Sequence, residues 1–328
     1  MKKRILGKTG FEISEISLGT WQVGGKWGER FDHALADRIL NTAVDHGVNF
    51  IDTADVYGNG ESEKAVGRLI HSRNERIYVA TKCGRKLSPH TDEKYQPEVL
   101  RQFVEHSLKS MNLETLDLIQ LHCPPTEVYY NGEVFKALDE LKKEGKIINY
   151  GVSVEKVEEA LKAIQYPDLA SVQIIFNMFR QKPAEVFLKE AKKKDVGIIV
   201  RVPLASGLLT GKMSTSTIFS KDDHRSFNRN GEVFDKGETF SGVDYESGLK
   251  AVEELKKFLP SKEPLAKLAL RWILMFDEVS CVIPGASSAE QIASNVGAGL
   301  LSTFTPEEMA KVTEIYEKYI KASVHTFW

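Results

Sequence analysis

The chain has 328 residues, of which 42% are hydrophobic and 27% are charged, and its 44 basic and 46 acidic residues give a formal net charge of −2. This balance excludes a largely disordered chain, and the lack of a long basic tract argues against binding to nucleic acid or to a membrane surface. We therefore expect a small-molecule partner.

The N-terminus lacks the apolar core of a secretory signal, and no stretch of about 18 apolar residues runs uninterrupted. The three cysteines, Cys83, Cys123 and Cys281, are widely spaced, which favours neither a disulfide framework nor a zinc site. The expected location is therefore a reducing compartment, the cytoplasm. No pattern in the sequence indicates an oligomeric state.

Short runs rich in β-branched and apolar residues alternate with longer segments of helical period, a pattern typical of βα units around a parallel sheet. The predicted strands are 15–21, 48–53, 76–82, 116–122, 147–153, 171–177, 197–202 and 279–284. The length is compatible with one barrel or with two domains. Eight strands favour a (β/α)8 TIM barrel over an open doubly wound sheet, which more often has fewer strands, so we expect residues 1–328 to form one domain.

Three predicted helices have well-marked ends. One follows Asp32 as its N-cap and stops at Gly47, a second begins at Pro97, and a third ends at Gly145.

Four further features lie outside the repeat. Residues 4–14 read as a β-hairpin that closes the bottom of the barrel, and the long polar loop 204–246 after strand seven reads as a lid. Near the end, Thr305 opens a helix with a capping box, and the tail 322–328 is left to fold over the barrel.

The catalytic groups of such a barrel project from the C-terminal ends of its strands. Strand two ends in Asp52 and leads to Tyr57, strand three ends in Lys82, and strand four ends in His122, so we expect these four side chains to converge. Hydrogen-bonding groups also end strands five to seven.

These four residues together favour a particular chemistry. A free phenol has a pKa of about 10, but the ammonium group of Lys82 favours the phenolate, and Asp52 keeps the lysine charged. His122 can orient a substrate oxygen from the opposite side. The set suits protonation of a carbonyl oxygen, but none of its members can supply a hydride, so a cofactor is required.

Seven segments, each at the top of a predicted strand and in chain order, now point to a family. They read FIDTADVYG, VATK, LDLIQLHCP, YGVS, VQIIFN, PLASGLLTGK and IPGASSAEQIASN. In these segments, and over nearly its whole length, the chain resembles the aldo-keto reductase family. The resemblance implies an NADPH-dependent reduction of aldehydes or ketones, in which Tyr57 is the general acid, Lys82 lowers its pKa, Asp52 pairs with the lysine, and His122 orients the carbonyl.

The resemblance also implies a set of cofactor contacts. Those for the nicotinamide and its ribose are Thr20, Trp21, Ser153 and Gln173. Those for the pyrophosphate are Leu204, Ser206, Gly207 and Lys212. A helix N-terminus near Ser287, with Gln291 and Asn295, is the expected seat of the 2′-phosphate.

The sequence departs from the family pattern at several of these places. Arg201 stands where the family usually has an aromatic residue that stacks on the nicotinamide, and it could stack its flat guanidinium there or reach the pyrophosphate. Gly285 and Gln291 stand where several relatives have a lysine and an arginine, which weakens the preference for NADPH over NADH. We expect Arg225, from the long loop, to supply the missing charge. Val154 replaces a second amide beside Ser153.

Several tempting residues have simpler interpretations. Asp55 lies in the turn after strand two, where an aspartate most often bonds its local backbone, and Cys83 and Cys123 read as small packing residues. Among the tryptophans, Trp21 reads as lining a substrate pocket, whereas for Trp27 and Trp328 pocket and packing are equally open.

Two other functions also fit the sequence. One is a low-turnover, cofactor-binding regulatory module that resembles the β subunits of potassium channels. The other is a Schiff-base enzyme with Lys82 as its nucleophile, which would leave Tyr57 and Asp52 unexplained.

Overall fold

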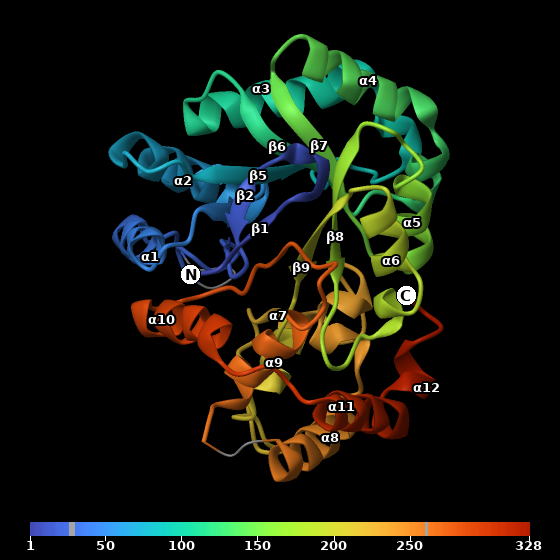
Figure 1. The fold of residues 1–328 in the computed structure, drawn as a ribbon. Helices are drawn as coiled ribbons and strands as arrows, with labels where there is room; N and C mark the ends of the chain where they lie inside the picture. The colour runs from blue at the N-terminus through green and yellow to red at the C-terminus, as the bar shows by residue number, and fades with distance from the viewer. Residues whose placement is uncertain (26–29, 260–261) are drawn as a thin grey trace.

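The computed structural model describes residues 1–25, 30–259 and 262–328. In these ranges eight parallel strands form one sheet that is nearly closed into a barrel, and helices surround it (Figure 1). The strands are β3 (Leu18–Gly19), β4 (Phe50–Asp52), β5 (Tyr78–Cys83), β6 (Leu116–His122), β7 (Ile147–Ser153), β8 (Leu169–Ile175), β9 (Gly197–Arg201) and β10 (Cys281–Val282). The predicted (β/α)8 barrel is confirmed.

The first and last strands are shorter than the predicted segments 15–21 and 279–284. Where the barrel closes, the two edges meet only through isolated parallel bridges, Ile16 with Val282 and Gly19 with Gly285. The other neighbouring strands pair along their ladders, with one register shift between β7 and β8 at Tyr150 and Gly151. The hydrogen-bond ladder is therefore least regular at the seam.

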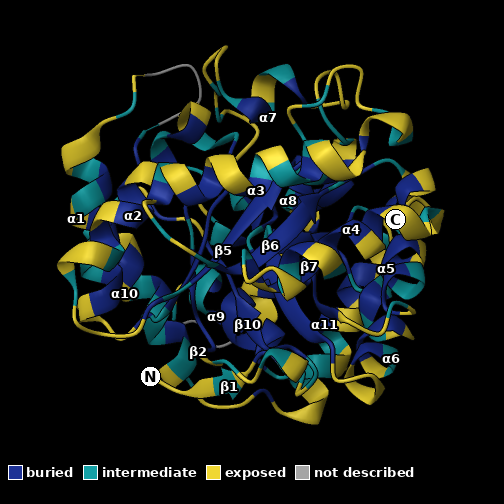
Figure 2. Ribbon diagram, turned by 90° about the horizontal axis from the view of Figure 1, so that it is seen from above, coloured by how far each residue is buried: buried dark blue, intermediate teal, exposed yellow. Residues whose placement is uncertain are grey.

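The helices lie on the outside of the strands and bury one side each. They are α1 (His33–Asp45), α2 (Glu61–Ser72), α3 (Pro97–Met111), α4 (Gly132–Lys143), α5 (Val157–Ala163), α6 (Phe187–Lys193), α7 (His224–Phe227), α8 (Tyr245–Phe258), α9 (Leu265–Ile273), α10 (Ala289–Gly297), α11 (Pro306–Tyr319) and α12 (Lys321–Val324). Figure 2 shows buried strands such as β5, β6 and β7 inside a ring of helices whose outer sides are exposed. None of the helices in these ranges is long and apolar enough to cross a membrane.

The predicted helix ends are confirmed where hydrogen bonds define them. The side chain of Asp32 accepts from the backbone N–H of Leu35 at the start of α1. At the start of α11, Thr305 and Glu308 form the reciprocal capping box that their spacing predicts. The tail beyond α11 folds back, and Trp328 is buried, donating from Nε1 to Asp235 of the long loop.

The N-terminal hairpin closes the bottom of the barrel, as predicted. Strand β1 (Lys3–Ile5) pairs antiparallel with β2 (Glu12–Ser14), and Gly10 turns the chain with a φ of 70°. Leu6 and Ile13 are fully buried in a cluster with side chains from the barrel interior, including Phe50. The hairpin thus fills the end of the barrel opposite the catalytic strand ends.

We expect truncation of Leu6 to destabilise the protein, because its side chain is buried in this end cluster. Leu6→Ala should lower the free energy of unfolding by about 2–4 kcal/mol through lost burial and a residual cavity. Ile5→Ala, on the same hairpin but with Ile5 55% exposed, should change it by less than about 0.5 kcal/mol. Urea denaturation measures both, and equal effects would show that the hairpin does not fill the barrel.

Candidate active site

The catalytic candidates share the barrel interior because of strand periodicity. Alternate residues of a strand face the same side, so Asp52 follows Phe50 and Lys82 follows Ala80 toward the axis, while His122 follows Leu118 by two such steps. Phe50, Ala80 and Leu118 belong to the interior cluster. The polar residues form the next layer, at the C-terminal ends of the strands, which confirms the expected convergence.

Asp52 and Lys82 form a buried ion pair. Lys82 Nζ lies 2.5 Å from Asp52 Oδ1 and 2.8 Å from the carbonyl oxygen of Thr53, and both side chains are essentially inaccessible. The second carboxylate oxygen, Oδ2, accepts from Gln120 at 3.2 Å and from Gln173 at 2.7 Å. The carboxylate is therefore held on both oxygens, as a buried charge requires.

Tyr57 is in the loop after β4, and its hydroxyl lies 3.3 Å from Lys82 Nζ. The turn that presents it passes through Gly58 and Asn59, both with positive φ. Burial raises the pKa of Tyr57, and Lys82 opposes this shift without cancelling it. Lys82 thus acts in the predicted direction, but burial has the larger effect, and Tyr57 keeps its proton and can donate it.

His122 faces Tyr57 across the site. Their rings meet edge to face, with centroids 6.0 Å apart. Burial and the nearby guanidinium of Arg85 hold the pKa of His122 well below its ordinary value. The imidazole is therefore neutral at physiological pH, and its Nε2 lies 3.4 Å from Nη1 of Arg85.

The residues expected at the nicotinamide lie around this centre. Ser153 Oγ is 3.4 Å from Gln173 Oε1 at the ends of the adjacent strands β7 and β8. Thr20 is buried and donates to the carbonyl oxygen of Asp52, so its side chain supports the catalytic strand. Trp21 packs against His224 of the long loop. Trp27 lies outside the described residues.

The loop after β9 contains the residues expected at the pyrophosphate. Ser206 and Gly207 have φ of 52° and 98°, and a Cβ at Gly207 would lie 2.6 Å from Met213. Leu204 is partly buried and Lys212 is exposed. Arg225 pairs with Asp223 and approaches the carbonyl oxygen of Ser206 to 3.4 Å.

The residues expected at the adenosine phosphate surround the start of α10. Gly285, Ser287 and Gln291 are exposed. The backbone N–H and the hydroxyl of Ser287 both donate to Gln291 Oε1, and Asn295 donates to the carbonyl oxygen of Gly285. Arg225 instead contacts Asp223 and the carbonyl oxygen of Ser206.

The guanidinium of Arg201 is hydrogen-bonded and is not free to stack on a nicotinamide ring. Its Nη2 donates to the carbonyl oxygen of Val154 at 3.0 Å and to Glu155 Oε2 at 2.9 Å, and its Nη1 lies 3.9 Å from Glu238 Oε2. The guanidinium is therefore part of a charged cluster at the strand ends.

Sequence reasoning missed three members of this cluster: Arg85, Glu155 and Glu238. Arg85 follows Lys82 by three residues and Glu155 follows Ser153 by two, so their position just after strand ends could have signalled them. Glu238 lies in the long loop and pairs with Arg85 at 2.8 Å. No local pattern marks it.

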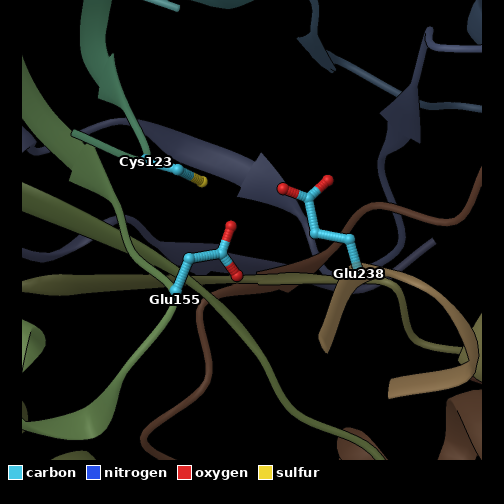
Figure 3. A group of neighbouring side chains, drawn as sticks. All are labelled: Cys123, Glu155 and Glu238. Carbon is cyan, nitrogen blue, oxygen red and sulfur yellow. The ribbon is translucent and has the colours of Figure 1, made fainter. Parts of the chain in front are cut away.

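Cys123 also differs from its predicted packing role, whereas Cys83 is a buried core residue as expected. Figure 3 shows Cys123, Glu155 and Glu238 pointing toward one another from three separate segments. Their ligand atoms lie within 4.8 Å of one another, a spacing that could hold a cation. Because Arg85 and Arg201 already pair with both carboxylates, the group is part of an ion-pair cluster and we do not assign a metal to it.

Asp55 is buried, which its turn position did not predict. Burial raises its pKa to about 7, and only part of this shift is opposed by Lys86 and by the backbone of Val56. The folded protein therefore favours the neutral carboxylic acid.

This shift predicts a pH-dependent effect of Asp55→Asn. The stabilising contribution of the protonated carboxyl is fully present below its unfolded pKa of about 4 and is lost as the pH rises through about 7. From pH 5 to pH 8, the free energy of unfolding of the variant should therefore rise relative to that of the native protein. The rise is about 1.4 kcal/mol for each pH unit up to about pH 7, where it levels off. Urea denaturation at both pH values measures the difference, and a constant difference would contradict the shifted pKa.

The chain is similar to several known proteins. It is 30% identical to the uncharacterized oxidoreductase YqkF of Bacillus subtilis, with 94% of each chain covered. It is 29% identical to the NADH-specific methylglyoxal reductase of Escherichia coli, over 91% of this chain and 93% of that one. It is also 29% identical to a probable voltage-gated potassium channel subunit beta of Arabidopsis thaliana, over 97% of both.

Solved structures have the same fold. The holo form of an aldo-keto reductase from Bacillus halodurans superposes with a TM-score of 0.78 at 27% identity, over 96% of both chains. A glycerol dehydrogenase from Gluconobacter oxydans superposes with a TM-score of 0.76 at 30% identity, over 97% of this chain and 96% of that one. The model of the aldo/keto reductase family matches residues 15–317, and the chain belongs to that family.

Proposed function

We propose that this protein reduces aldehydes or ketones to alcohols, with Tyr57 donating a proton to the carbonyl oxygen. The observation that carries the proposal is a neutral phenol beside a neutral imidazole, with ring centroids 6.0 Å apart and the Lys82 ammonium 3.3 Å from the phenol oxygen. The phenol supplies the proton, and Lys82 stabilises the phenolate that remains. The neutral imidazole of His122 can donate one N–H hydrogen bond to the carbonyl oxygen and so orient it.

A bound NAD(P)H would supply the hydride. The residues present fit such a cofactor, because Ser153 and Gln173 offer a hydroxyl and an amide beside the pair of Asp52 and Lys82. We propose NADPH as the preferred form, with NADH as the alternative. NADPH is what the resemblance to the family implies. Two observations support the NADH alternative: one relative is named as NADH-specific, and the Ser287 N–H, where a 2′-phosphate is expected, already donates to Gln291.

The cytoplasm remains the proposed location.

The observations bear differently on the two other functions that fit the sequence. For a Schiff base, Lys82 would have to be a neutral amine. Burial alone would lower the pKa of Lys82, but Asp52 and Tyr57 outweigh burial and raise it, so the ammonium persists. A low-turnover regulatory module is favoured by the similarity to the potassium channel subunit. Single-turnover hydride transfer, compared with the steady-state rate, separates slow release from slow chemistry.

The proton donor is tested by Tyr57→Phe. We expect kcat for an aldehyde to fall by about 10²–10⁴-fold, because the variant keeps the ring and loses the acidic proton. Steady-state oxidation of NADPH measures the rate, and NADPH titration by protein fluorescence, as a control, should give a dissociation constant close to that of the native protein. Full turnover by the variant would refute the assignment.

The role of Arg225 is tested by Arg225→Ala with both cofactors. We expect the dissociation constant of NADPH to rise about tenfold, because a charge-assisted hydrogen bond contributes roughly 1.5–3 kcal/mol. A rise for NADPH alone assigns Arg225 to the 2′-phosphate, and equal rises for NADPH and NADH assign it to the pyrophosphate. Unchanged constants for both would show that Arg225 does not bind the cofactor.

A further inference from the structure

Two guanidinium groups converge on one carboxylate beside the catalytic histidine. Nη2 of Arg85 lies 2.8 Å from Glu238 Oε1, and Nη1 of Arg201 lies 3.9 Å from Glu238 Oε2. The same Arg85 reaches Nε2 of His122 with its other terminal nitrogen. We propose that Arg85 and Arg201 form the binding site for a carboxylate of the substrate. The carboxylate of Glu238 occupies this site in the structure described here.

The proposal rests on carbonyl reduction at Tyr57 and His122 and narrows its substrates to short-chain oxo acids. The guanidinium of Arg85 contacts both His122 and the carboxylate of Glu238. A substrate with its carbonyl at His122 and its carboxylate in place of Glu238 would therefore have only a few carbon atoms between the two groups. The carboxylate is a binding group alone. Hydride adds to the carbonyl carbon, the Tyr57 proton goes to the oxygen, and the carboxylate passes through the reaction unchanged.

The charges of the cluster favour an anion. Burial raises the pKa of Glu155 to about 8, with Arg201 opposing, so the neighbouring carboxyl groups of Glu155 and Glu238 together hold one proton at neutral pH. Burial would also raise the pKa of Glu238, but Arg85 and Arg201 outweigh it and lower the pKa to about 2. Two guanidinium groups therefore face one ionised carboxylate, which leaves one positive charge in surplus.

The Glu238 side chain can leave without unfolding its loop. The backbone of this segment is held by other groups: Ser206 Oγ donates to the carbonyl oxygen of Glu238 and accepts from the N–H of Phe240, and Asp235 accepts from the N–H of Gly237. Rotation of the side chain alone would free Nη2 of Arg85 and Nη1 of Arg201, while Nη2 of Arg201 would keep its contacts with Val154 and Glu155. Arg85 and Arg201, in contrast, follow or end strands of the barrel and stay in place.

An intramolecular carboxylate competes with a substrate at a high effective concentration. Glu238 should therefore weaken the binding of oxo acids while excluding weaker anions, and its removal should strengthen their binding. If Glu238 instead only positioned Arg85, its removal would weaken their binding. The sign of this one effect separates the two roles.

The experiment compares 4-oxobutanoate with methyl 4-oxobutanoate, an aldehyde of the same chain length without the charge. For the native protein with NADPH we expect kcat/KM for the acid to exceed that for the ester at least about tenfold, which corresponds to one charge-assisted contact. Arg85→Met should lower this ratio by about tenfold or more, and Arg85→Lys, which keeps the charge and loses the paired donors, should lower it less. Glu238→Gln should raise the ratio.

Lys86→Met is the matched control, because Lys86 is the exposed neighbour of Arg85 and its loss should leave the ratio unchanged. An equal rate for acid and ester in the native protein, or a ratio that Arg85→Met and Arg85→Lys do not change, overturns the proposal. A lower ratio in Glu238→Gln overturns the exchange with Glu238. A preference for glyceraldehyde 3-phosphate over 4-oxobutanoate would assign the site to phosphate and overturn the carboxylate assignment.

Calorimetric titration with succinate separates this proposal from the proposed function. If neither aldehyde is reduced but succinate binds and Arg85→Met abolishes the binding, carbonyl reduction is refuted and the carboxylate site stands. If the ester is reduced and succinate does not bind, the reductase stands and the carboxylate site is refuted.

Discussion

The buried ion pair between Asp52 and Lys82 is the constraint on which the rest of the site depends. Taking two charges out of water costs several kcal/mol per ion unless the pair is close and its remaining atoms are hydrogen-bonded. Here strands β4 and β5 bring the charges together, and Gln120 and Gln173 complete the carboxylate from β6 and β8. A barrel interior can offer such partners from several strands at one height, because its inward residues form layers.

Two layers of charge with different origins lie above the apolar bottom of the barrel. The lower layer is the pair of Asp52 and Lys82, and the side chains that bind the carboxylate, Gln120 and Gln173, come from strands. The upper layer is the cluster of Arg85, Arg201, Glu155 and Glu238, in which the long loop supplies one partner. The strands therefore fix the lower layer, whereas the upper layer also depends on the position of the loop.

The electrostatic field of the upper layer also explains the state of the reacting groups. Arg85 and burial keep His122 neutral, so the imidazole can polarise a carbonyl without adding a second positive charge beside Lys82. Burial raises the pKa of Tyr57 despite the lysine, so the phenol holds its proton until the carbonyl oxygen needs it. In the proposed reduction, the proton would therefore start on Tyr57.

The sequence alone determined the order of the eight strands, the hairpin at the bottom, and the layer that Asp52, Lys82 and His122 share. These follow from hydrophobic period and from the alternation of side chains, which are local properties of a strand. Only the tertiary structure decided that Asp55 is buried, that Arg201 pairs with Glu155, and that Arg85 meets Glu238 across 153 residues of chain. The physical reason is that a loop without a period carries no local signal of what it contacts, whereas burial and charge depend on all the neighbours that folding brings together.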